Sequence, residues 1–485
     1  MNLIEGMLQK STVENTKGGE YYSTTYNKNL DLYSKMVRYD NEENLKLLFR
    51  NAMNENAKLA VANLLYILDI RNGKGERRAF KIIFKELCFL DKEYAQIVLS
   101  LIPELGRWDY ILEGLYTPIR QDVLGLIKSQ LKEDINSEHP SLLGKWLPTL
   151  KSKKNGIAVD LCTSLDMTKR EYRKMLVSLR EKLNIIERNL SQKRYDGINL
   201  ENVPTKAILK YRKALAKHLG KKYTTFLDNI NNGNAKVNTK GLFCYDIIKK
   251  IMQNRYNITD EDRKLFNAMW EQQKDIFKDN HNNILTMADT SGSMYWEDDN
   301  VIATSIGLAL YTAARNNGIF KDYYMTFSSR PLLQKVSGID IVDKYKNVEE
   351  IAENTDIDKA FELLLETAKD NSISQEDMPS HILIVSDMEF DRGVYSQEGT
   401  NFNGWKKAFS EAGYKLPQII FWNLGRKGFP VTRFDNDVCM ISGFSTSVLE
   451  NLLKSEDLVN LTPTKVMLDT LNKYIALLEK NQKNV

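Results

Sequence analysis

Oxygen-bearing side chains stand at three places in the C-terminal half of the sequence. Asp289, Ser291 and Ser293 form an Asp-x-Ser-x-Ser turn directly after an apolar run, and Asp387 follows a second apolar run. Thr355 opens a helical pattern between them. Carboxylate and hydroxyl oxygens are the ligands that Mg²⁺ prefers, and they also suit Ca²⁺ and Mn²⁺. We therefore expect the five residues to hold a metal ion. The alternative is that Ser291 and Thr355 only cap helices.

A basic block lies between residues 145 and 222. It contains 20 Lys and Arg against 7 Asp and Glu, a local charge of +13, whereas the whole chain carries +4. A basic block in an otherwise acidic chain suggests a polyanionic partner, and nucleic acid is the commonest one. The candidate RNA contacts are Lys151, Lys153, Lys154, Lys169, Arg170, Arg173, Lys206, Lys210, Arg212, Lys213, Lys217, Lys221 and Lys222.

The helix expected between Pro204 and Gly220 carries lysines at steps of four, three and four on one face. They are Lys206, Lys210, Lys213 and Lys217. A solvated lysine face is the alternative explanation. Binding is favoured because like charges at this spacing repel one another, and because two further lysines at 221 and 222 extend the row.

Two regions must position these residues. Up to about residue 280 the apolar residues have helical spacing, for instance at 45–67 and in one stripe over 166–190. After that, short apolar runs at 284–288, 323–327, 382–385 and 419–422 alternate with helical patterns, and a last amphipathic helix is expected at 464–480. We expect an α-helical repeat domain, a HEAT-like solenoid or ring, over 1–280. A doubly wound, mostly parallel α/β domain is expected over 281–485.

Composition excludes several classes of protein. No window approaches eighteen uninterrupted apolar residues, so we expect no membrane-spanning helix. The first residues lack the pattern of a signal peptide, and the four cysteines show no CxxC spacing. A cytoplasmic protein with reduced cysteines is expected. The four histidines are scattered, so we expect no zinc site.

Catalytic motifs are absent from the sequence. It contains no GxxxxGK[ST] phosphate loop, no GxSxG elbow and no HExxH pair. Glu389 and Asp391 are the only general-base candidates near the expected metal site. We therefore expect a protein that is not an enzyme.

The C-terminal residues resemble a von Willebrand factor A domain, a Rossmann-like fold. The Asp-x-Ser-x-Ser turn, Thr355 and Asp387 match the three loops of its metal-ion-dependent adhesion site. Thr355 follows Glu and Asn where the family has a Gly-rich context. The resemblance implies a bound Mg²⁺ and a protein partner that offers an acidic residue to it.

Residues 69–77 and 102–109 are similar to the TROVE module of Ro autoantigen-type RNA-binding proteins. Residues 145–148 and 203–206 look more like an uncharacterised TROVE-like branch. The resemblance implies a ring of helical repeats before an A domain. It also implies binding of small structured RNAs on a basic outer surface, and of single-stranded ends of misfolded RNAs through the ring. For Arg71, Lys74 and Arg77 the alternative is ordinary surface charge on a helix–helix turn.

Two functions remain open. The first is a Ro-type RNA-binding protein for small structured or misfolded non-coding RNA, whose A domain recruits a partner. The second is a protein-interaction scaffold without nucleic acid, in which the metal site captures an acidic residue of a partner protein. The basic block favours the first, and the metal-site residues are neutral between the two.

Overall fold

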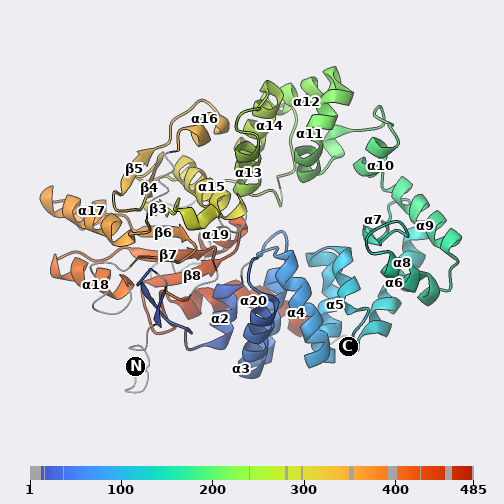
Figure 1. Cartoon of the computed structure of the whole chain (residues 1–485), viewed down its shortest axis with the longest axis horizontal. Helices are drawn as coiled ribbons and strands as arrows, with labels where there is room; N and C mark the ends of the chain where they lie inside the picture. The colour runs from blue at the N-terminus through green and yellow to red at the C-terminus, as the bar shows by residue number, and fades with distance from the viewer. Residues whose placement is uncertain are drawn as a thin grey trace.

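The computed structural model shows a helical N-terminal region followed by an α/β unit (Figure 1). It describes residues 13–15, 17–36, 38–239, 241–278, 282–295, 299–348, 354–391, 401–425, 428–453 and 461–482. The expected fold class, helices followed by a mostly parallel sheet covered by helices, is confirmed.

The helical region begins after a short hairpin of β1 (Val13–Glu14) and β2 (Glu20–Tyr21). Its first helices are α2 (Lys28–Lys35), α3 (Glu42–Leu68), α4 (Arg77–Leu90), α5 (Lys92–Leu105), α6 (Arg120–Asn136) and α7 (Leu143–Trp146). They continue with α8 (Asn155–Ser164), α9 (Lys169–Lys182), α10 (Ile186–Ser191), α11 (Thr205–Leu219), α12 (Lys221–Asn231), α13 (Cys244–Gln253) and α14 (Asp260–Glu271). Two 3₁₀ helices, Trp108–Gly114 and Leu200–Asn202, lie between them.

Two predicted helical segments are interrupted. α3 spans the expected run at 45–67, but Asn56 inside it has an extended backbone with φ of −157°, so two helices meet there at a kink. The apolar stripe over 166–190 is divided between α9 and α10. Asn184 between them has φ of 44°, a left-handed conformation that ends α9. The start of α9 is set by a capping box of Thr168 and Glu171.

The sheet contains six strands in the order β5-β4-β3-β6-β7-β8. Their bounds are β3 (Ile284–Ala288), β4 (Tyr323–Thr326), β5 (Leu332–Lys335), β6 (His381–Ser386), β7 (Gln418–Asn423) and β8 (Val438–Ser442). Only the edge strand β5 pairs antiparallel to its neighbour among these strands. The four predicted strands are present, whereas β5 and β8 were not predicted.

Helices cover both faces of the sheet. They are α15 (Asp299–Arg315), α16 (Ile341–Lys346), α17 (Ile357–Asp370), α18 (Asn401–Glu411), α19 (Thr446–Leu453) and α20 (Pro463–Gln482). Alternate strand residues enter two cores: Leu383 and Val385 of β6 face the core of α15, α19 and α20, and Ile382 and Ile384 face that of α17 and α18. Further 3₁₀ turns lie at Gly292–Tyr295 and Gln375–Asp377.

The helical region begins and ends on the α/β unit. At its start α2 packs against β8 and α20, and α3 packs against α20; at its end α13 packs against α15. Between these contacts the helices trace a ring in Figure 1, from α3 through α5, α9 and α11 back to α13. The core of the helices is therefore continuous with one core of the sheet.

Candidate metal site and basic surface

The two aspartates of the predicted metal site follow neighbouring parallel strands. Asp289 comes directly after β3 and Asp387 directly after β6, and Ala288 is in register with Val385. Asp289 N donates to Val385 O at 2.9 Å, which extends the pairing by one residue. The carboxyl ends of parallel strands are where open α/β sheets bind ligands.

The carboxylate of Asp289 is fully buried and accepts hydrogen bonds from two serines. Its Oδ2 accepts from Ser386 Oγ at 2.6 Å, and its Oδ1 accepts from Ser291 N at 2.9 Å. The hydroxyl oxygens of Ser291 and Ser293 lie 3.0 Å apart. Burial raises the pKa of Asp289, and the hydrogen bonds from Ser386 and Ser291 oppose that rise. The structure thus brings the predicted Asp-x-Ser-x-Ser donors together.

The carboxyl group of Asp387 lies close to Asp289 and Ser293. Burial, and after it the charge of Asp289, raise the pKa of Asp387 to about 7. Its Oδ1 accepts from Glu389 N at 3.1 Å. A Cβ on Gly425 would lie 2.2 Å from Asp387 O, so the glycine after β7 lets that loop approach the site closely. Two buried carboxylates that repel one another favour a cation between them.

Thr355, also fully buried, is tied to the loop that follows β6. Its hydroxyl lies within hydrogen-bond distance of Glu389 O at 2.8 Å and of Asp391 Oδ1 at 3.0 Å. Its backbone N donates to Asp391 Oδ2 at 3.0 Å. Asp391, one of the two general-base candidates, therefore anchors the threonine in this structure.

Lys17 reaches the site from the N-terminal hairpin. Its Nζ donates to Thr355 Oγ1 at 2.8 Å and to Glu389 O at 3.3 Å. Its charge is close enough to Asp289 to lower the pKa of that carboxyl against the effect of burial. Local sequence patterns do not predict this contact, because Lys17 and Thr355 are 338 residues apart.

The donors fit a hard divalent cation. Two carboxylates and two serine hydroxyls converge, and water is needed to complete an octahedron. Across the described ranges, no group of three or more His, Cys, Asp or Glu side chains is arranged to hold a metal ion. The predicted site differs from such a group because three of its five predicted protein ligands are hydroxyls.

The predicted RNA contacts lie on α9, α11 and α12 and on the segment before α8. Twelve of the thirteen side chains are exposed. Lys206 pairs with Asp246 at 2.9 Å, and Lys210 lies 4.7 Å from the ring centroid of Tyr211. The prediction was wrong for Arg212, which is 6% exposed and pairs with Asp262 at 2.8 Å. Arg212 belongs to the packing of α11 against α14.

The Gly-rich turn after α3 joins the helical region to the α/β unit. Lys74 is buried; its Nζ donates to Tyr33 O and, at 2.7 Å, to Ser442 Oγ of β8. Tyr474 OH of α20 donates to Asp69 Oδ2 at 3.0 Å. For Lys74 both sequence-based explanations, RNA contact and surface charge, were wrong. Arg71 and Arg77 are exposed.

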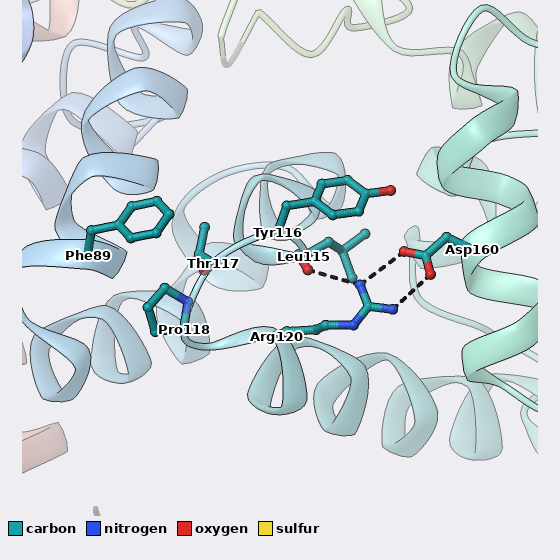
Figure 2. A pocket seen from close by; sticks show the side chains of 7 residues that line it. All are labelled: Phe89, Leu115, Tyr116, Thr117, Pro118, Arg120 and Asp160. Carbon is teal, nitrogen blue, oxygen red and sulfur yellow. Dashed lines mark hydrogen bonds and ion pairs between the residues drawn. The ribbon is translucent and has the colours of Figure 1, made fainter.

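A pocket of about 510 Å³ lies between α4, the start of α6 and α8 (Figure 2). Phe89 lines one side of it, across from Tyr116. On the other side the Arg120 guanidinium donates hydrogen bonds to Asp160 Oδ1 at 2.8 Å and to Leu115 O at 2.9 Å. None of the predicted site residues lines this pocket.

Comparison with known proteins gives relatives without an assigned function. Residues 283–484 match a family model described as "Domain of unknown function (DUF7788)", and residues 158–289 match "Domain of unknown function (DUF2828)". The chain is 26% identical to an uncharacterised protein of Acanthamoeba polyphaga mimivirus, over 97% of this chain and 88% of the relative. Within the described ranges no helix is both long and apolar enough to cross a membrane.

Proposed function

We propose that this protein binds small structured or misfolded non-coding RNA through the exposed lysines and arginines of α9, α11, α12 and the segment just before α8. The observation that carries the proposal is the face of α11, where Lys206, Lys210, Lys213 and Lys217 are all exposed beside the exposed Lys221 and Lys222. Within the described residues only Lys206 of these six forms an ion pair with a carboxylate. Phosphates of an RNA backbone would supply the missing counter-charges.

The arrangement of the elements supports the comparison with Ro-type TROVE proteins. A ring of helices precedes an α/β unit, and the ring both begins and ends on that unit (Figure 1). In this proposal the helical region is TROVE-like and HEAT-like, and the α/β unit is a von Willebrand A-like domain. The protein is not an enzyme in this account, and it acts in the cytoplasm.

The metal site has a recruiting role in this proposal. Asp289, Ser291, Ser293 and Asp387 would hold Mg²⁺, with Thr355 as the fifth protein ligand. The ion would supply a positive centre that accepts an acidic oxygen of a partner protein. Scaffolding without RNA is the competing function, because such a site alone would be enough to capture a partner.

RNA binding is tested by charge reversal on α11. The parent chain and a variant with all four α11 lysines changed to Glu are titrated with a structured RNA carrying a single-stranded 3′ tail, at several salt concentrations. Each lost phosphate contact lowers the slope of log K against log salt by about 0.7–0.9, so we expect the slope to fall by about 3.

A matched control carries the same charge change on the α/β unit. Four exposed lysines there, Lys321, Lys346, Lys369 and Lys406, are changed to Glu. The control should bind RNA nearly as well as the parent. Equal RNA binding by the parent and the α11 variant, with both folded by circular dichroism, would show that this surface is not the RNA site.

A further inference from the structure

The turn between β1 and β2 places the side chain of one lysine, Lys17, beside the candidate metal site. Asn15 Oδ1 accepts from Lys17 N at 2.8 Å and from Gly19 N at 2.9 Å, which closes the turn. Gly18 has φ of 81°, a conformation that glycine adopts without strain. The side chain of Lys17 leaves this closed turn and ends at Thr355 Oγ1.

The same turn is attached to the loop that carries Asp387. Asn15 Nδ2 donates to Phe390 O at 2.8 Å, and Gly18 forms a bridge with Asp391. A Cβ on Gly19 would lie 2.3 Å from Phe390 O, so the turn lies directly against that loop. These three contacts, one from the Asn15 side chain and two from the backbone of the glycines, place the Lys17 ammonium beside the predicted ligands.

Lys17 and a divalent cation would share one oxygen atom, the hydroxyl oxygen of Thr355. The hydroxyl of Thr355 accepts from the ammonium, and a lone pair used in that hydrogen bond is not available to a metal ion. Both charges are positive, and the side chains of Asp289, Thr355 and Asp387 beside them are buried, so screening by water is weak. The docked Lys17 ammonium therefore opposes metal binding, and a bound metal ion opposes docking of Lys17.

We propose that Lys17 is a tethered cation that competes with the divalent metal ion, so that metal binding releases the β1–β2 turn. This inference rests on the metal site of the proposed function. Metal-dependent capture of a partner would then require displacement of the chain's own N-terminal turn. The released turn would uncover the loop at residues 387–391 for that partner.

The release would be local because the following residues have their own anchors. Tyr22 N donates to Phe429 O at 2.8 Å, and Phe429 N donates to Tyr22 O at 3.0 Å. Further along, Arg433 N donates to Thr25 O at 3.0 Å. These bonds lie outside the turn, so β2 and α2 would keep their places when Lys17 leaves.

The test compares metal affinity in full-length variants by calorimetric titration with Mg²⁺ and Mn²⁺. Lys17→Met removes the competing charge, and Lys17→Arg keeps it. If the docked turn blocks the site in nine molecules of ten, its removal raises the apparent affinity about tenfold. We expect this gain in Lys17→Met and not in Lys17→Arg.

A second readout is the reactivity of the Lys17 amine, followed by acetylation and mass spectrometry. We expect Mg²⁺ to increase labelling of Lys17 and to leave labelling of Lys369, an exposed lysine of α17, unchanged. Asp289→Ala should abolish this response to Mg²⁺.

The outcomes separate this inference from the metal site itself. Equal or weaker affinity in Lys17→Met, with binding still lost in Asp289→Ala, would overturn the competition and leave the metal site standing. Failure of the parent and of Lys17→Met to bind either metal would overturn both. Binding by Lys17→Met alone would support both.

Discussion

Neighbouring residues on α11 should respond in opposite ways to the same substitution. Arg212 and Asp262 form a pair at 2.8 Å, and each side chain is 7% exposed. Asp262 Oδ2 has no hydrogen-bond partner in the described part of the chain. Arg212→Met would leave that carboxylate buried without its countercharge. Loss of one partner of a buried pair costs about 3 kcal/mol or more, so the free energy of unfolding should fall by about 3 kcal/mol.

Lys213→Met is the matched control, since Lys213 is exposed and carries no ion pair in the described residues. Its free energy of unfolding should change by less than about 0.5 kcal/mol. Its affinity for RNA should fall, with the salt slope reduced by about 0.7–0.9. A double variant, Arg212→Met with Asp262→Leu, should recover most of the lost stability because both charges are removed.

The assay is urea unfolding followed by circular dichroism, together with RNA titration of each variant under conditions where it remains folded. Arg212→Met should bind RNA like the parent. If instead it unfolds at the parental urea concentration and binds RNA more weakly, Arg212 contacts phosphate, and our account of the buried pair is refuted.

Three further predictions concern other parts of the molecule. Asp289→Ala should abolish Mg²⁺ binding in calorimetric titration and leave RNA affinity within about twofold of the parent; parental Mg²⁺ affinity in this variant would contradict the site. Burial lowers the pKa of Lys74 to about 7 from its ordinary 10.5, so the unfolded chain binds more protons between these pH values. The unfolding free energy of the parent relative to Lys74→Met should therefore rise from pH 7.5 to 9.5, by about 1.4 kcal/mol per unit, and a flat difference would refute it. Thr168→Ala removes the cap of α9 and should cost about 1 kcal/mol in urea unfolding, whereas an unchanged midpoint would show that the cap contributes nothing.

Much of the fold could be predicted from the sequence because its core strands are short apolar runs. β3, β6 and β7 are buried along their whole length, and the runs at 284–288, 382–385 and 419–422 identify them. β8 has a similar signal, with four apolar residues in five, and could have been found. β5 could not, since this edge strand is mostly exposed and carries no alternating pattern.

The location of Arg212 could also have been predicted. It lies four residues after Ile208 and three before Leu215, so it falls on the buried face of α11 and not among the lysines. Lys17 could not have been found in this way, because its contact depends on how the N-terminal hairpin meets a loop more than 300 residues away. Local periodicity carries no information on such pairings.

The most direct test of the account is recovery of the tagged protein from its own cells, with and without ribonuclease, followed by sequencing of the bound RNA. We predict discrete small RNAs that are lost at high salt and are absent when the four lysines of α11 are changed to Glu. Recovery free of RNA, with a protein partner retained only while Mg²⁺ is present, would contradict RNA binding and assign the function to the metal site.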